Sequence, residues 1–187
     1  MIEKFQNKYR ITSTRLAGWN YASDAAYFIK ICTRNREHFF GEINNSKMML
    51  NEIGKMAEKY WLEISDHFPF VELGNFVVMP NHVHGILIID RGPGFIENVE
   101  ALHCNASTFS KISPKPGSIS TIIRSYKSVV TKNVRLSGIS KSHLNIDFAW
   151  QPRFHDHIIR NNQSFHQIQD YIEQNPEKWK EDRFHLN

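Results

Sequence analysis

The chain has 187 residues, which suggests a single domain with a hydrophobic core of its own. Its formal net charge of +4 permits a polyanionic partner without requiring one. Only two cysteines, Cys32 and Cys104, exclude a disulfide framework and a Cys-x-x-Cys metal pair. The sequence has no apolar stretch of about 18 residues and no signal peptide. We therefore expect a soluble, cytoplasmic protein with no membrane partner.

The first third of the chain predicts an extended arm, a strand and a helix. Residues 1–24 are polar with scattered aromatics and form the expected arm. Residues 27–33 form an apolar, strand-like run, and a charged turn follows over 34–45. From Ser46, the expected N-cap, apolar residues recur at helical spacing as far as Ile64.

The rest of the chain alternates between strand-like runs and helical stripes. The predicted elements are strands 70–79 and 82–89, a helix over 118–133, a strand over 156–160 and a helix over 164–175. Two polar stretches, 90–118 and 135–147, separate them, and we expect the first to be a long mobile loop. The order β-α-β-β-α-β-α predicts an α+β fold of ferredoxin-like or RRM-like plan. Its central antiparallel sheet would carry helices packed on one face, in one domain over 1–187.

The segment Met79-Pro80-Asn81-His82-Val83-His84 is the most informative motif. Side chains two residues apart on a strand point to the same face, with Cα atoms about 6.5–7 Å apart. His82 and His84 can therefore reach one shared cation while Val83 points into the core. The pair is half of a metal site. Taken alone, it is equally compatible with a structural pair or with an unrelated metal protein.

Two tyrosines follow the histidine pair, Tyr126 and Tyr171. Tyr126 lies in the helix predicted over 118–133, close to Arg124 and Lys127, and this setting would suit a phosphate. A tyrosine can act as a nucleophile when cations stabilise the phenolate and a metal polarises the phosphate. The same helical periodicity also makes Tyr126 a core aromatic on an amphipathic stripe.

Further short blocks, each weak alone, run in order along nearly the whole chain. They are residues 14–21, 27–36, 40–43, 79–84, 123–128 and 148–160. With a His-hydrophobe-His strand and a later tyrosine on a helix, the ordered set resembles the HUH endonuclease superfamily. The closer resemblance is to its single-tyrosine transposases, and among these to the REP-associated tyrosine transposases.

The resemblance implies an enzyme that cuts and rejoins single-stranded or hairpin DNA through a 5′-phosphotyrosine intermediate. On the matching positions Tyr126 would be the nucleophile, and His82 and His84 would hold Mg²⁺ or Mn²⁺. Related insertion-sequence transposases place a third metal ligand, a glutamine, one turn after the tyrosine. Here that position is Val130, which cannot bind a metal. The resemblance allows either a homodimer or a monomer.

Several basic and aromatic residues are candidates for DNA contact. The cations are Lys30, Arg34, Arg36, Arg124, Lys127, Arg153 and Arg160, and the alternative is that they are solvated surface charges. Trp150 could stack a base or be a buried aromatic. His155 and His157 lie on a predicted strand that could neighbour the metal site, and the alternative is that they face DNA or are structural.

Three functions remain open. The first is a metal-dependent DNA strand transferase. The second is a nucleic-acid-binding module of the same fold that has lost catalysis, an idea motivated by Val130. The third is a hydrolase or oxygenase of small molecules, which would hold Zn²⁺ or Fe²⁺ tightly and would need a third strong ligand.

Overall fold

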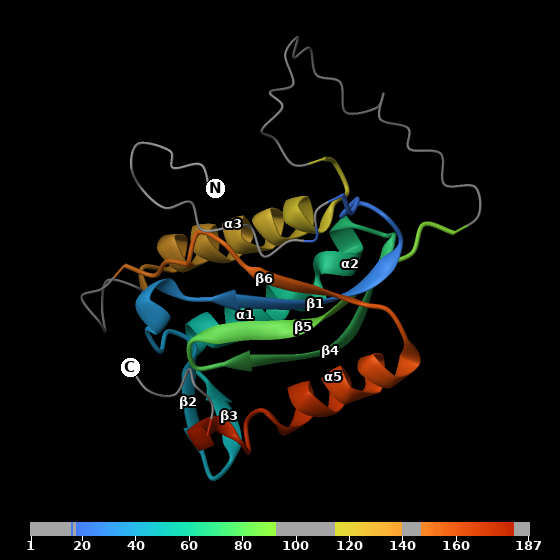
Figure 1. The fold of residues 1–187 in the computed structure, drawn as a ribbon. Helices are drawn as coiled ribbons and strands as arrows, with labels where there is room; N and C mark the ends of the chain where they lie inside the picture. Colours follow the sequence, from blue (N-terminus) through green and yellow to red (C-terminus); the bar gives the residue numbers. More distant parts are fainter. Residues whose placement is uncertain (1–15, 17, 93–114, 140–146, 182–187) are drawn as a thin grey trace, which may run out of the picture.

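The computed structural model describes residue 16 and residues 18–92, 115–139 and 147–181 (Figure 1). Most of the expected N-terminal arm and most of the two expected polar loops lie outside these residues. Within the described part of the chain, no helix combines the length and apolar character needed to cross a membrane.

Four antiparallel strands form the central sheet in the spatial order β4-β5-β1-β6. They are β1 (Ala25–Cys32), β4 (Val71–Met79), β5 (His82–Ile89) and β6 (His155–Ile159). The predicted α+β class with an antiparallel ferredoxin-like sheet is confirmed. Because β5 pairs on both sides, its two histidines lie in the interior of the sheet and not at its edge.

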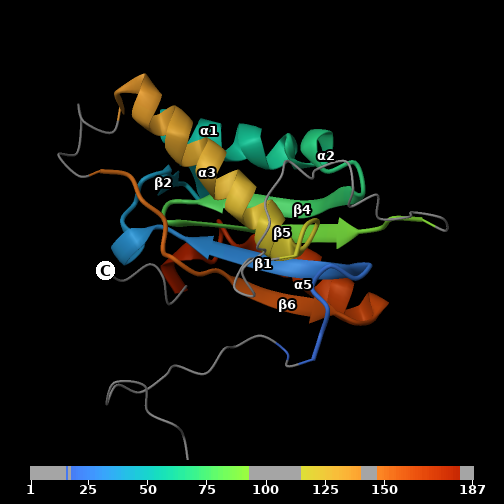
Figure 2. The ribbon, with the colours of Figure 1, turned by 90° about the horizontal axis from the view of Figure 1, so that it is seen from above.

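Helices cover both faces of this sheet (Figure 2). α1 (Glu52–Leu62) and α3 (Ile119–Ser137) share one face, and the short α2 (Ile64–His67) follows α1. The C-terminal helix α5 (Asn162–Gln174) packs on the opposite face. α1 and α3 are thus packed on one face as predicted, and α5 adds a further layer.

Strand alternation assigns the side chains of β5 to these two faces. Val83 and Leu87 join the large hydrophobic core under α1 and α3. Ile86 joins a smaller cluster under α5. His82 and His84 lie four and two residues before Ile86 and therefore share its face of the strand, so both histidines face α5.

A β-hairpin follows β1, where the sequence predicted a charged turn and the start of a helix. Its strands are β2 (Gly41–Asn44) and β3 (Lys47–Leu50). Asn45 and Ser46 connect them with positive φ angles of 49° and 61°, the left-handed turn that short hairpins prefer. The prediction of Ser46 as a helix cap is therefore wrong. Asn51 caps α1 instead, because its side chain accepts a hydrogen bond of 2.9 Å from the Gly54 N–H.

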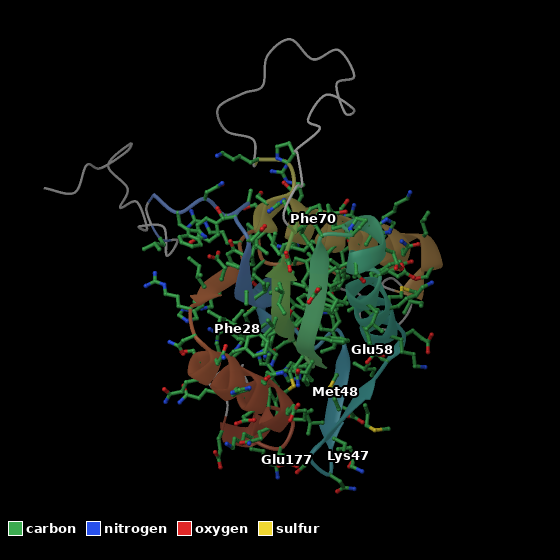
Figure 3. All side chains as sticks on the ribbon, turned by 90° about the vertical axis from the view of Figure 1, so that its right-hand side faces the viewer. Phe28, Lys47, Met48, Glu58, Phe70 and Glu177 are labelled. Atoms are coloured by element: carbon green, nitrogen blue, oxygen red, sulfur yellow. The ribbon has the colours of Figure 1, made fainter. Side chains whose placement is uncertain are left out.

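α5 begins directly after β6, with Arg160 and Asn161 as the only connecting residues. The Asn161 side chain caps the helix by accepting a hydrogen bond of 2.8 Å from the Ser164 N–H. The apolar stripe of the helix consists of Phe165, Ile168 and Ile172, and it joins a cluster with residues from all four strands of the sheet. In Figure 3 the labelled Phe28 of β1 lies on this side of the sheet, and Glu58 of α1 lies on the other.

Candidate active site

His82 and His84 form a closely spaced pair beneath α5. Both side chains are fully buried, and their ring centroids lie 4.9 Å apart with the rings nearly perpendicular. The spacing allows both rings to reach a single cation, as the strand geometry predicted.

Asn81 orients the first ring of the pair. Its Oδ1 lies 2.8 Å from Nδ1 of His82, and since a carboxamide oxygen can only accept, Nδ1 carries the proton. The lone pair of a neutral His82 is then on Nε2. This is the kind of support that fixes ligand orientation in metal sites. Within the described residues, Nε2 of His82 and both ring nitrogens of His84 are buried and make no hydrogen bond.

The electrostatic environment keeps both imidazoles neutral. Burial, with a smaller contribution from the charge of Lys30, lowers the pKa of His84 to about 3. Burial also holds the pKa of His82 well below its usual range, with smaller contributions from His84, Lys30 and Arg36. Neutral imidazole is the metal-binding form, so the pair needs no deprotonation before it binds a cation at neutral pH.

We expect the free energy of unfolding to fall as the pH drops from 7 to 5. Below the unfolded-state pKa of about 6.5, the unfolded chain binds a proton that the folded chain excludes until the pH approaches about 3. His84 alone should reduce the stability by about 2 kcal/mol over this interval. Urea denaturation at both pH values measures the effect. His84→Leu should show the smaller loss, and equal losses in both proteins would contradict the assignment.

Tyr171 of α5 lies directly against the histidine pair. Its ring centroid is 5.3 Å from that of His84, with an edge-to-face angle of 86°, and 6.1 Å from that of Phe28. The residue is 43% exposed, so part of it is accessible to an incoming substrate. Tyr171 therefore combines proximity to the histidines with access for a large ligand.

A polar clamp holds α5 in this orientation. Asn75 lies at the register shift of β4, between Leu73 and Phe76. Its Oδ1 accepts a hydrogen bond of 2.8 Å from Gln169, and its amide donates to the carboxylate of Glu173. Gln169 and Glu173 are one helical turn apart and bracket Tyr171, so the clamp fixes the rotation of the helix about its axis.

Tyr126 does not share this site, so its prediction as the partner of the histidines is wrong. The side chain belongs to the core on the opposite face of the sheet and is 2% exposed. Its hydroxyl donates a hydrogen bond of 3.0 Å to the Ala57 carbonyl, and the ring packs edge-on against Trp61. Burial raises the pKa of the Tyr126 phenol, which opposes formation of a phenolate. The structure supports the alternative interpretation, in which Tyr126 is a core aromatic on the amphipathic stripe of its helix.

Asn175, at the C-terminal end of α5, is a buried polar residue with an unsatisfied oxygen atom. It follows Tyr171 by one helical turn, is 3% exposed, and has a buried Oδ1 without a hydrogen-bond partner within the described residues. Four residues further on, the Trp179 ring lies 6.0 Å from that of His82. In the sequence, Asn175 is thus midway between two residues whose rings contact the histidine pair.

Three of the predicted DNA-binding cations lie near the histidines. Lys30 is buried on β1 and pairs with His84 of β5. Arg36 lies in the short 3-10 turn after β1 (Arg34–Arg36), close enough to His82 to lower its pKa. Arg34 is exposed in the same turn.

The other predicted cations lie further away. Arg153 is exposed ahead of β6, and Arg160 is exposed at its far end. Arg124 and Lys127 belong to α3, on the other side of the sheet, so they do not flank the tyrosine that meets the histidines. Nζ of Lys127 donates to the Gln151 carbonyl, and burial lowers its pKa to about 8.

The remaining candidates divide between the core and the site face. Trp150 is 9% exposed, packs on Phe40 and Phe148, and donates to a backbone carbonyl, so it is a core aromatic. His155 and His157 are exposed on β6, and their pairing with Lys30 and Phe28 places them on the site face. Among the described residues, no group of three His, Cys, Asp or Glu side chains could hold a metal ion.

Sequence reasoning missed Tyr171, Asn175 and the orienting role of Asn81. The sequence did contain a pattern that pointed to Tyr171 and Asn175. A metal-ligating side chain was expected one turn after the tyrosine, and Val130 fails that requirement after Tyr126. Asn175 meets it after Tyr171 with a carboxamide oxygen. No pattern in the sequence shows which face of the sheet each helix covers. The available criterion for choosing between the two tyrosines was a metal-ligating side chain one turn after the tyrosine.

Comparisons with known proteins show a relative and a fold. No family model matches the chain. The chain is 37% identical over 180 residues to an uncharacterized protein of Haemophilus influenzae, with 94% of this chain and 93% of that protein covered. Its fold is similar to that of a REP-associated tyrosine transposase solved bound to a REP hairpin. The TM-score is 0.56 at 19% identity, over 90% of this chain and 74% of the other.

Proposed function

Since this chain belongs to one family with the Haemophilus influenzae protein and has the fold of an HUH single-tyrosine transposase, we propose that it is a DNA strand transferase. The observation that carries the proposal is the contact between the Tyr171 ring and the buried His82–His84 pair. A nucleophile and two neutral imidazoles meet where α5 packs on the sheet. The basic net charge of +4 favours a polyanionic substrate.

Tyr171 is the nucleophile in this proposal. Its phenolic oxygen attacks the scissile phosphorus of a single-stranded or hairpin DNA, and the P–O3′ bond breaks. The products are a 5′-phosphotyrosine and a strand end whose 3′-oxygen takes up a proton. A second transesterification, in which a 3′-hydroxyl attacks the phosphotyrosine, rejoins the strands and frees Tyr171. The bond energy is conserved at each step, so the reaction needs no nucleotide cofactor.

The residues around the pair fit a divalent cation such as Mg²⁺ or Mn²⁺. His84 has two buried ring nitrogens without hydrogen bonds, and Asn175 has a buried oxygen in the same state. Two imidazoles and one carboxamide oxygen leave room for water and for a DNA phosphate oxygen, which these hard cations prefer. When bound, the ion would polarise the phosphate as a Lewis acid. Asn175 thereby takes the place that Val130 could not fill.

We place the strand transferase ahead of the two alternative functions. The binding module without catalysis was motivated by Val130, and Val130 follows Tyr126, which is not the nucleophile in this proposal. A zinc or iron enzyme acting on small molecules would need a third strong ligand, and none joins the pair within the described residues.

Trapping the covalent intermediate tests the proposal. The protein is incubated with 3′-end-labelled DNA hairpins that carry single-stranded tails, in the presence of Mn²⁺. Label that migrates with the denatured protein on a gel is the expected result, because a 5′-phosphotyrosine retains the 3′ side of the cut. Stable binding of these hairpins with no adduct under Mg²⁺ or Mn²⁺ would overturn the transferase proposal and favour the binding module.

A further inference from the structure

Asn75 lies in a β-bulge of β4, the strand at one end of the sheet order. Leu73 pairs with Leu87 and Phe76 with Gly85, so β4 advances by three residues where β5 advances by two. The extra residue changes the alternation of the strand, and Leu73 and Phe76 both pack in the core under α1 and α3. Asn75 reaches the other face of the sheet, where its side chain contacts α5.

The backbone of β5 is shaped for this bulge. A Cβ atom on Gly85 would lie 2.5 Å from the Cβ of Phe76 and 3.1 Å from the Asn75 carbonyl oxygen. Glycine is therefore required opposite the bulge, because any side chain there would push β4 away. The position of Asn75 is thus fixed by the pairing of two strands and not by a flexible loop.

Asn75 holds α5 on the flank that faces away from Tyr171. α5 lies next to β4 in Figure 1, and the Asn75 side chain accepts from Gln169 at 2.8 Å and donates to the Glu173 carboxylate. Gln169 and Glu173 are each two residues from Tyr171, and at about 100° per residue both lie on the opposite flank of the helix. The Tyr171 ring contacts His84 on one flank while the polar clamp holds the other.

The apolar contacts of α5 leave its rotation less well defined than the clamp does. Its apolar stripe packs in a small cluster, and apolar contact has no preferred direction. A hydrogen bond restricts both distance and angle. An atom about 6 Å from the axis of a helix moves by about 1 Å when the helix rotates by about 10°. A misplacement of that size at a reacting group can lower the rate by about a hundredfold.

Resting on the proposed function, we propose that Asn75 is a positioning residue of the strand transfer. Its hydrogen bonds to Gln169 and Glu173 set the rotation of α5 at which the phenolic oxygen of Tyr171 is in line with the scissile phosphorus. Asn75 acts only through α5. Its loss should therefore lower the rate of attack and leave the binding of Mn²⁺ and DNA unchanged.

An exchange of amide and carboxylate across the clamp tests this role. Asn75→Asp should slow adduct formation about a hundredfold at saturating Mn²⁺ and hairpin DNA, because the new carboxylate faces that of Glu173 and has no proton to donate. Glu173→Gln should stay within about threefold of the parent, since the Asn75 amide can still donate to a carbonyl oxygen. In the double variant the new carboxylate accepts from both glutamine side chains, so the rate should return to within about threefold of the parent.

Two further variants separate the clamp from charge and from folding. Asn75→Ala removes the clamp without adding charge and should slow the reaction about tenfold. Gln163→Glu adds a negative charge at an exposed position near the start of α5 and should keep the parental rate. Affinities for Mn²⁺ and for the hairpin, measured with Tyr171→Phe in each background, should stay within about twofold of the parent.

Fluorine NMR observes the position of Tyr171 without any reaction. The full-length protein is labelled with 3-fluorotyrosine and studied without DNA or metal, and Tyr171→Phe identifies the Tyr171 signal. The ring lies against His84 and Phe28, so a rotation of α5 should shift this signal. Asn75→Asp should shift it, and addition of Glu173→Gln should bring it back.

Three results would overturn the role of Asn75. They are a parental rate in Asn75→Asp and Asn75→Ala, a double variant as slow as Asn75→Asp, and a loss confined to Mn²⁺ or DNA affinity. If the parent forms the adduct, any of these leaves the transferase proposal in place. If the Tyr171 signal shifts and returns as expected but no adduct ever forms, the transferase is overturned and Asn75 remains the residue that positions α5.

Discussion

Tyr171→Phe should abolish the covalent protein–DNA adduct, whereas Tyr126→Phe should form it at nearly the parental rate. Removing a nucleophile typically lowers the rate by about 10⁴-fold or more. The Tyr171 ring is 43% exposed, so loss of its hydroxyl leaves the fold intact. The rate of adduct formation, measured with labelled hairpin DNA and saturating Mn²⁺, distinguishes the two tyrosines.

The matched control is the stability of the Tyr126 variant. Tyr126→Phe keeps the ring packing but loses the hydrogen bond to the Ala57 carbonyl, so it should lower the free energy of unfolding by about 1 kcal/mol. Urea denaturation measures this effect. If the adduct forms normally with Tyr171→Phe, or disappears with a stable Tyr126→Phe, the assignment of the nucleophile is incorrect.

His84→Leu should lose Mn²⁺ affinity by about a hundredfold or more while the protein remains folded. Leucine fills a similar volume and carries no polar atom into a site that is fully buried. Adduct formation should fall in parallel, and in the parent it should stop with a chelator and return when Mn²⁺ is added. Asn175→Ala should give a smaller loss, about tenfold, because water can replace one carboxamide oxygen. Isothermal titration at pH 7 measures both affinities.

His157→Ala is the control for this series. His157 is an exposed histidine on the same face of the sheet, but it belongs to the edge strand β6 and pairs with Phe28. Its loss should leave Mn²⁺ affinity within about twofold of the parent. An equal loss of Mn²⁺ affinity in His157→Ala and His84→Leu would contradict the assignment of the metal site to the buried pair.

The sequence was sufficient for the four strands of the central sheet and for most helices because their periodicity is strong. The apolar runs of β1, β4 and β5 and the stripe of α3 are all where the pattern predicted them. The hairpin after β1 was missed because its turn needs left-handed conformations at both Asn45 and Ser46, and of the two only asparagine favours that conformation.

The site was predicted only in part for a geometric reason. The alternation of a strand is local, so His82 and His84 could be placed together from the sequence alone. The tyrosine comes from a helix, and an amphipathic stripe shows that a helix is buried on one side without showing which sheet face it covers. Tyr126 and Tyr171 both lie on such helices, and only the fold separates them. Flanking charges at Tyr126 were misleading because Arg124 and Lys127 belong to the far side of the sheet.

The short connection between β6 and α5 has a consequence for stoichiometry. Arg160 and Asn161 let the flanking Cα atoms separate by at most about 11 Å, so the helix that bears Tyr171 docks on the sheet to which its own β6 belongs. In the proposed reaction each polypeptide would therefore hold one DNA strand end at a time. Joining two strand ends would then require either repeated use of the same tyrosine or the arrival of a second loaded copy.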